Sequence, residues 1–208
     1  MNVSVDVISD VICPWCFIGK RRMEKAIAAL DAKVNVRWLS FQLNPTMLKE
    51  GISRREYRTK KFGSWERSMQ LDANIVVAGK DEGILFDFDR MERTPNTLDS
   101  HRLIWLADKE GVQDAVVEAL FRAYFTDGRD ISDRQTLLDV VAEAGLGRSK
   151  AEAVLKGGAG QEAIREADEL ARRVRVEGVP FFVINGKITL SGAQPPNAFL
   201  AAFEQSRG

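Results

Sequence analysis

Hydrophobic and polar positions alternate at the start of the chain, where valines at positions 3, 5 and 7 are separated by polar residues and lead into Ile8. This alternation predicts a largely buried β-strand over residues 3–8. Apolar residues then recur at helical spacing between Phe17 and Leu30, with charged residues mostly on the opposite face. Residues 34–42 are rich in β-branched and aromatic side chains and predict a second strand. A β-α-β order normally places both strands parallel in one sheet.

Helical signals dominate residues 46–175, which show little strand pattern. Three serines are followed three residues later by Glu or Gln, the capping-box spacing that starts helices: Ser53–Glu56, Ser132–Gln135 and Ser149–Glu152. Three glycines are predicted to end helices: Gly63, Gly111 and Gly145. A wide apolar stripe over residues 116–125 predicts a helix packed inside a bundle. The glycine cluster at 157–160 predicts a turn between two helices, because the lysine and hydroxyl of a Walker phosphate loop are absent.

Strand character returns after Gly178. Asn185-Gly186 separates the strand-like run 181–184 from residues 187–191, and this dipeptide strongly predicts a β-hairpin. A last amphipathic helix is predicted over residues 196–205. The chain is therefore expected to be an α/β protein in which a helical block interrupts a β-α-β unit and its hairpin.

The chain has two cysteines, and they form the motif Cys13-Pro14-Trp15-Cys16. Chance would produce this spacing in about one such chain in a hundred. If Cys13 caps the predicted helix, Cys16 lies one turn later on the same face, close enough for the sulfurs to form a small disulfide. The positive end of the helix dipole would stabilise a thiolate on Cys13, which is therefore the candidate nucleophile. Pro14 suits the first helical turn because its missing N–H is not needed there.

Composition narrows the possible partners and location. Lys plus Arg and Asp plus Glu both number 30 among 208 residues, so no global basic field predicts binding to nucleic acid or to an anionic membrane. No apolar run approaches the length of about 20 residues that a bilayer span requires, and the N-terminus lacks the pattern of a signal peptide. We therefore expect a cytoplasmic protein, in which a lone C-x-x-C is more often catalytic or metal-binding than a structural disulfide.

Several segments together resemble the thioredoxin superfamily, its DsbA-type branch and, more narrowly, the FrnE-like subfamily. The segments that carry the resemblance are Ser9-Asp10-Val11-Ile12-Cys13-Pro14-Trp15-Cys16 followed by Ile18-Gly19-Lys20-Arg21-Arg22, Asn96-Thr97 with His101-Arg102-Leu103, and Gly178-Val179-Pro180-Phe181-Phe182 with Ser191-Gly192-Ala193-Gln194. The resemblance implies a thioredoxin-like fold with an inserted all-helical domain. It divides the chain into a thioredoxin-like core, 1–45 and 176–208, and an inserted helical domain, 46–175.

The resemblance also implies a function and a substrate site. It implies a thiol-disulfide oxidoreductase or isomerase that acts on protein or small-molecule thiols and disulfides. Pro180 is implied to follow a cis peptide bond beside the cysteines, and the backbone of Val179 to pair with an extended substrate by strand addition. No dissociable cofactor is expected, although an external thiol such as glutathione must recycle the pair. Either a monomer or a homodimer is compatible with the sequence.

Two other functions are weighed against disulfide exchange. Structural zinc needs four ligands, whereas Cys13, Cys16 and His101 supply three, so no metal is expected within one chain. Kappa-class glutathione transferases and hydroxychromene carboxylate isomerases share the fold but generally carry serine where Cys13 stands, so they form the alternative. Some longer FrnE-like members carry a further C-terminal cysteine pair, which this chain lacks.

Other residues near the motif have competing interpretations. His101 is the single histidine and is placed on an apolar helix face, where a core histidine satisfied by a neighbour is favoured over a proton shuttle facing Cys13. Trp15 is assigned equally to substrate contact and to packing over the motif. Asp10 is expected to act as a turn or capping group. The run Lys20–Arg22 is predicted to be a solvated face, and four large residues are predicted to be core more than groove: Trp65, Met69, Phe86 and Phe88.

Overall fold

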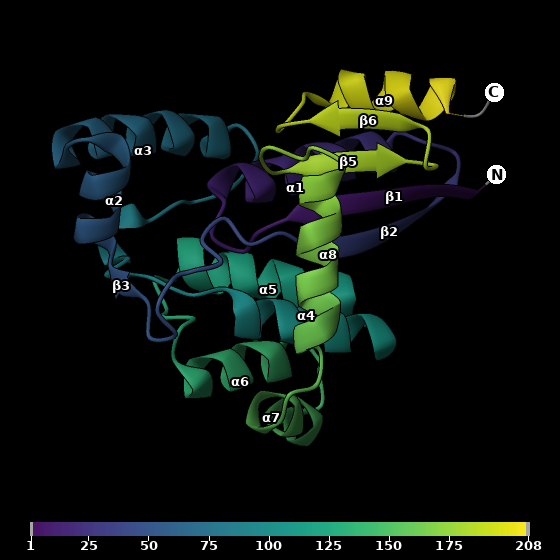
Figure 1. Cartoon of the computed structure of the whole chain (residues 1–208). Coiled ribbons are helices and arrows are strands. Elements are labelled where there is room, and N and C mark those ends of the chain that lie inside the picture. Colours follow the sequence, from purple (N-terminus) through teal and green to yellow (C-terminus); the bar gives the residue numbers. More distant parts are fainter. Residues whose placement is uncertain (1, 207–208) are drawn as a thin grey trace.

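The computed structural model describes residues 2–206, and a four-stranded sheet runs through it (Figure 1). The strands are β1 (Asn2–Ser9), β2 (Lys33–Ser40), β5 (Phe181–Ile184) and β6 (Ile188–Ser191), in the order β2-β1-β5-β6. β1 pairs parallel to β2 and antiparallel to β5, which in turn pairs antiparallel to β6. The predicted strands, the parallel β-α-β pairing and the hairpin are confirmed.

The hairpin turn forms because its two residues accept a left-handed backbone. Asn185 has φ 50° and Gly186 has φ 65°, the positive values that a two-residue turn of this kind requires. The Asn185 side chain also accepts a hydrogen bond from the backbone N–H of Ser4 at 2.8 Å, which joins the turn to β1.

Helices pack around this sheet. α1 (Pro14–Ala28) and α9 (Pro196–Gln205) lie against each other, while α4 (Leu98–Lys109), α5 (Gln113–Phe125) and α8 (Gln161–Arg173) contact β2. α6 (Arg134–Glu143) and α7 (Arg148–Lys156) pack beyond α4 and α5. The core passes from the sheet into the bundle through aromatic contacts, such as Phe17 of α1 stacked on Phe121 of α5 with ring centroids 5.1 Å apart.

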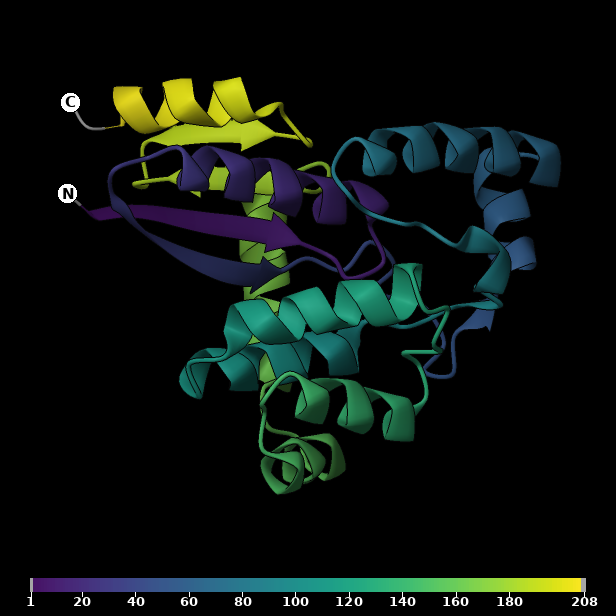
Figure 2. The same cartoon turned by 180° about the vertical axis from the view of Figure 1, so that it is seen from behind.

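A separate lobe stands beyond the start of α1. It contains α2 (Arg54–Phe62) and α3 (Trp65–Lys80), and Figures 1 and 2 both show it set apart from the sheet. The short strands β3 (Ile52–Ser53) and β4 (Arg93–Thr94) pair at its base, next to a 3₁₀ turn at Phe88–Arg90. The division of the chain into 1–45 with 176–208 and 46–175 stays a prediction.

The capping-box predictions met different outcomes. Ser53 caps α2 and accepts a hydrogen bond from the Glu56 N–H, as predicted. The other two predictions are wrong, because α6 is capped by Asp133, one residue after the predicted serine, and α7 begins after Gly147, which places Ser149 inside its first turn. A capping box marks one possible helix start, and the neighbouring Asp133 and Gly147 can also act as N-cap residues.

The prediction of a solvated basic face at Lys20–Arg22 is also wrong. The Lys20 side chain is only 2% exposed, and its ammonium group pairs with Glu24, Asp114 and Glu118. α5 packs across this part of α1 and brings two of the three carboxylates. Burial lowers the pKa of Lys20, but the carboxylates of Asp114 and Glu24 raise it by more, so its net shift is upward.

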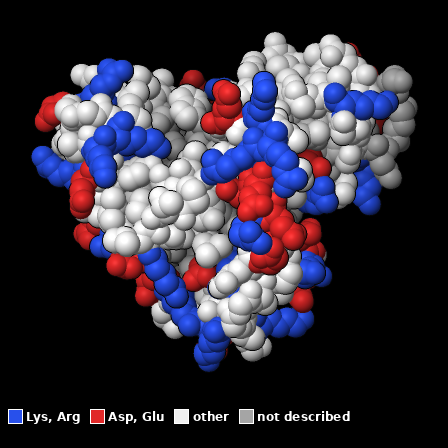
Figure 3. All heavy atoms as spheres, viewed as in Figure 1, with Lys and Arg blue, Asp and Glu red and all other residues white. Residues whose placement is uncertain are grey.

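Charges of both signs are mixed on the face that carries α8. Figure 3 shows Lys and Arg among Asp and Glu along this helix, where Arg165 pairs with Glu162 and Glu169. Over residues 2–206, no helix combines the length and the apolar character needed to cross a bilayer.

Candidate active site

The cysteine pair lies at the junction between β1 and α1. The strand ends at Ser9, a short turn follows, and the Cys13 N–H donates to the Asp10 carbonyl oxygen at 3.0 Å. Cys13 is the N-cap of α1 and Pro14 its first residue. This confirms the predicted placement: Pro14 supplies a helical φ where no backbone donor is needed, and Cys16 enters the first turn.

The two thiols are unbridged and differ in access. Cys13 is 6% exposed and borders a cavity, whereas Cys16 is fully buried behind it. Burial raises the pKa of the Cys16 thiol well above its ordinary value, and the adjacent Cys13 sulfur adds to the rise. A backbone hydrogen bond from Asp10 acts in the opposite direction but does not reverse the shift. The pair therefore contains one reachable sulfur and one shielded, protonated sulfur.

The loop before β5 lies directly against Cys13. The Cys13 thiol donates a hydrogen bond to the Val179 carbonyl oxygen at 3.3 Å, and the Val179–Pro180 peptide bond is cis, as the resemblance implies. Gly19 on α1 makes this close approach possible, since a Cβ there would lie 3.0 Å from Pro180 Cγ and 3.1 Å from Phe182 Cζ. Two segments 166 residues apart thus meet at the reactive sulfur.

His101 lies behind the cysteines. It is 2% exposed, and its Nε2 lies 3.3 Å from Asp10 Oδ1. The other Asp10 oxygen accepts a hydrogen bond from the Leu43 N–H at 2.8 Å, so Asp10 joins the turn before Cys13 to α4 and to the loop that follows β2. This geometry fits the core interpretation of His101, satisfied by a neighbour. It does not place the imidazole in the cavity that Cys13 borders.

A cavity of about 390 Å³ opens beside Cys13. Its walls come from Ile12–Trp15, from α2 and α3, from the segment 88–94, and from the end of α5. Trp15, 40% exposed, lines this cavity, and its contact with substrate stays a prediction. Sequence reasoning missed most of the cavity lining, including four residues of α2: Arg54, Tyr57, Arg58 and Lys61. Their i, i+3, i+4 and i+7 spacing on one helix is the signal that could have found them.

The four large residues predicted to be core differ in their burial in the structure. Phe86 is buried and packs edge-on against Phe17 at 6.1 Å between centroids, as predicted. The core prediction is wrong for Met69, which is 49% exposed on α3. Phe88 is half-buried: it stacks on Phe86 at the edge of the core and also lines the cavity. Trp65 is half-buried, with the guanidinium groups of Arg54 and Arg55 over its ring.

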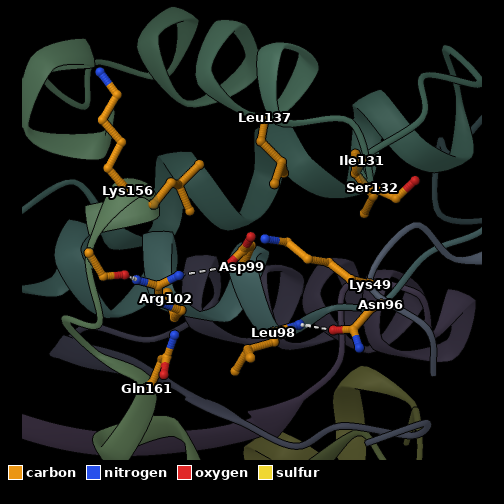
Figure 4. A pocket seen from close by; sticks show the side chains of 12 residues that line it. Lys49, Asn96, Leu98, Asp99, Arg102, Ile131, Ser132, Leu137, Lys156 and Gln161 are labelled. Carbon is orange, nitrogen blue, oxygen red and sulfur yellow. Dashed lines mark hydrogen bonds and ion pairs between the residues drawn. The ribbon is translucent and has the colours of Figure 1, made fainter. Parts of the chain in front are cut away.

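A second cavity of about 330 Å³ lies within the helical bundle (Figure 4). Arg102 lines it, donating to the carbonyl oxygens of Ala159, Val154 and Gly157 and pairing with Asp99. Its guanidinium therefore holds the glycine-rich turn before α8, which confirms that this cluster is a turn. The segment with Asn96 and Arg102, which carried part of the resemblance, thus has a structural role here.

No three His, Cys, Asp or Glu side chains gather as a metal-binding group among the described residues 2–206.

Comparison with known proteins identifies the family. The profile described as a DSBA-like thioredoxin domain matches residues 4–204. The chain belongs to the DsbA-like thioredoxin family. Within it, the chain is similar to a probable DsbA oxidoreductase from Streptomyces coelicolor, with 33% identity, TM-score 0.90, and coverage of 99% of this chain and 90% of that one.

Two more distant structures share the fold of this DsbA-like chain. The cytosolic disulfide reductase DsbM from Pseudomonas aeruginosa is 19% identical with TM-score 0.69, covering 98% of both chains. A 2-hydroxychromene-2-carboxylate isomerase is 18% identical with TM-score 0.71, covering 98% of this chain and 95% of that one. The predicted thioredoxin-like α/β fold of the DsbA type is confirmed.

Proposed function

We propose that this DsbA-like protein is a thiol-disulfide oxidoreductase in which Cys13 attacks and Cys16 resolves. The observation that carries the proposal is the unequal access of the two sulfurs. Cys13 borders a cavity at the start of a helix, whereas Cys16 is fully buried and its pKa is raised. An enzyme of this kind needs a nucleophile that substrate can reach and a second thiol that waits beneath it.

The reaction proceeds in two exchanges. The Cys13 thiolate attacks one sulfur of a disulfide, the substrate S–S bond breaks, and the departing thiolate takes up a proton. Cys16 then loses its proton and attacks the Cys13 sulfur, which breaks the mixed disulfide and releases the second substrate thiol. Two electrons have passed from the dithiol to the substrate, and a thiol pool such as glutathione restores the pair. The reverse sequence oxidises a dithiol.

Trapping the mixed disulfide tests this assignment. In Cys16→Ser the first exchange goes forward and the second cannot, so incubation with oxidised glutathione should leave a stable adduct on Cys13, seen by intact-mass and peptide spectrometry. The matched variant Cys13→Ser should form no adduct, because Cys16 is shielded. An adduct on Cys16, or none in either variant, would overturn the proposal.

A glutathione-dependent transferase or isomerase is the alternative function. The cavity beside Cys13 favours it, since its volume suits a small electrophile, and the isomerase named above shares the fold. DsbM has also been solved with glutathione. The alternative predicts turnover of glutathione with a small electrophile that survives Cys16→Ser, whereas disulfide reduction does not survive that change. The FrnE-like subtype belongs to our proposal and is supported by the sequence motifs. A cytoplasmic location also belongs to it and is supported by the structural likeness to the cytosolic reductase DsbM.

A further inference from the structure

The cavity beside Cys13 combines a reactive sulfur with a cationic wall. Arg54, Arg58 and Lys61 all line it from α2, and none of the lining residues, drawn from the described part of the chain, is acidic. Lys61 lies at the exposed edge, and its ammonium group donates to the Tyr57 hydroxyl. The wall that faces a bound molecule is therefore positively charged.

The two arginines are only half neutralised. Arg54 and Arg58 both pair with Asp72 of α3, which is itself buried, so one carboxylate serves two guanidinium groups. Burial lowers the pKa of Arg58, and the neighbouring Arg54 lowers it further, against the opposing effect of Asp72. An excess positive charge in a poorly hydrated site is costly until an anion pairs with it.

Both guanidinium groups retain unused donors. Arg54 donates to Asp72 through Nη2, and Arg58 donates to Ser68 and Asp72 through Nε and Nη2. Within residues 2–206 the Nη1 group of each arginine has no hydrogen-bond partner. Donors of this kind match a carboxylate, which accepts strong charge-assisted hydrogen bonds.

The remainder of the cavity suits an apolar body. Its other lining side chains are mostly hydrophobic or aromatic: Ile12, Leu43, Phe62, Leu71, Ile75, Phe88, Met91 and Phe125. A volume of about 390 Å³ falls within the range of small-molecule sites. Cys13 is only 6% exposed and borders this cavity, which favours a small molecule over a folded protein surface.

We infer that the preferred substrate is a low-molecular-weight disulfide with an apolar, aromatic-sized body and a carboxylate. The inference rests on the proposed function and names its substrate class. The carboxylate pairs with Arg58 and Arg54, the body packs on the apolar wall, and the disulfide sulfur meets Cys13. Attack by the Cys13 thiolate breaks the substrate S–S bond and releases one aryl thiolate. Attack by Cys16 releases the second, so the dithiol loses two electrons and the substrate gains them.

A pair of matched substrates tests this. 4,4′-Dithiobis(benzoic acid) and 4,4′-dithiobis(benzamide) differ only in the charge and hydrogen-bonding character of the end group. Their second-order rate constants with the reduced protein are measured by stopped-flow absorbance and divided by those with 2-mercaptoethanol, which removes the difference in intrinsic reactivity. We expect the normalised ratio of acid to amide to be about ten or more, the size of one charge-assisted contact.

Substitutions in the cavity wall show which side chain causes the preference for the acid. Arg58→Gln should bring the normalised ratio close to one, and Arg58→Lys should restore part of it. The control Arg165→Gln, on exposed α8, should leave the ratio unchanged. Should Arg58→Gln fail to fold, Lys61→Gln at the cavity edge serves instead and should lower the ratio several-fold.

The outcomes separate the two proposals. A wild-type ratio near one, a ratio that survives Arg58→Gln, or faster reduction of insulin than of either small disulfide would overturn the substrate class and leave the proposed function standing. Failure of the reduced protein to react with any disulfide would overturn the proposed function itself.

Discussion

Replacing Lys20 by methionine tests whether the active-site helix is held to α5 by a buried charge. Methionine preserves most of the methylene packing but removes the cation that pairs with three carboxylates. Breaking a fully buried ion pair typically costs about 3–5 kcal/mol. Here the carboxylates of Glu24, Asp114 and Glu118 are 37%, 57% and 23% exposed, so water partly compensates them. We expect the free energy of unfolding to fall by about 2 kcal/mol.

Guanidinium denaturation followed by far-ultraviolet circular dichroism measures this loss. Lys25→Met is the matched control, because the Lys25 side chain on the same helix is 51% exposed. Its partner Glu82, with a side chain 7% exposed, keeps Arg22 as a second cation, so we expect a loss of about 0–1 kcal/mol. The rate of disulfide reduction per folded molecule should be unchanged in both variants, since neither lysine borders the cavity. Equal destabilisation by the two substitutions would refute the reasoning.

Three further predictions concern the surroundings of the cysteines. Gly19→Ala should slow disulfide reduction several-fold by displacing Pro180. The control Gly158→Ala, where an added Cβ meets nothing within 4 Å, should leave the rate unchanged. Equal rates for the two variants would contradict the proposed contact between Gly19 and Pro180. His101→Leu should lower the free energy of unfolding by about 2 kcal/mol, because it removes one of the two hydrogen-bond partners of the buried Asp10 side chain, without changing the exchange rate in the folded fraction. A large rate loss at full stability would instead support the proton shuttle. Because the folded-state pKa of Cys16 is raised, the unfolded chain loses that proton first, so stability should fall as pH rises from about 8.5 to 10. Cys16→Ser should remove this alkaline slope, by up to about 1.4 kcal/mol per pH unit, in denaturation curves recorded across that range.

Local patterns predicted the framework of the site. The alternation before Ile8, the helical spacing after Phe17 and the turn at Asn185-Gly186 depend on neighbours in the chain, and the structure places each element within a few residues of its prediction. The cysteine spacing and Pro14 were enough to locate Cys13 at the start of α1. These features follow from backbone geometry, which a short stretch of sequence determines.

Features that depend on packing between distant segments were missed. The sequence alone predicts Lys20 at the surface. In the structure, α5 places Asp114, 94 residues later in the chain, against it. Arg54 and Arg58 were not singled out from the sequence, and the structure places them in the cavity wall together with residues of α3 and Tyr124. The residue pattern of one helix does not show which other element will pack on it. Charged residues on a short helix are therefore predicted to be exposed to solvent unless the tertiary contacts are known.

The unequal access of the two sulfurs also constrains the kinetics. Once Cys13 and Cys16 are joined, an incoming reductant can attack only the Cys13 sulfur, because Cys16 is fully buried. Under the proposed mechanism, substrate and recycling thiol would therefore use the same cavity in turn and could not occupy it together. We then expect ping-pong kinetics, in which each reactant competes with the other for one site.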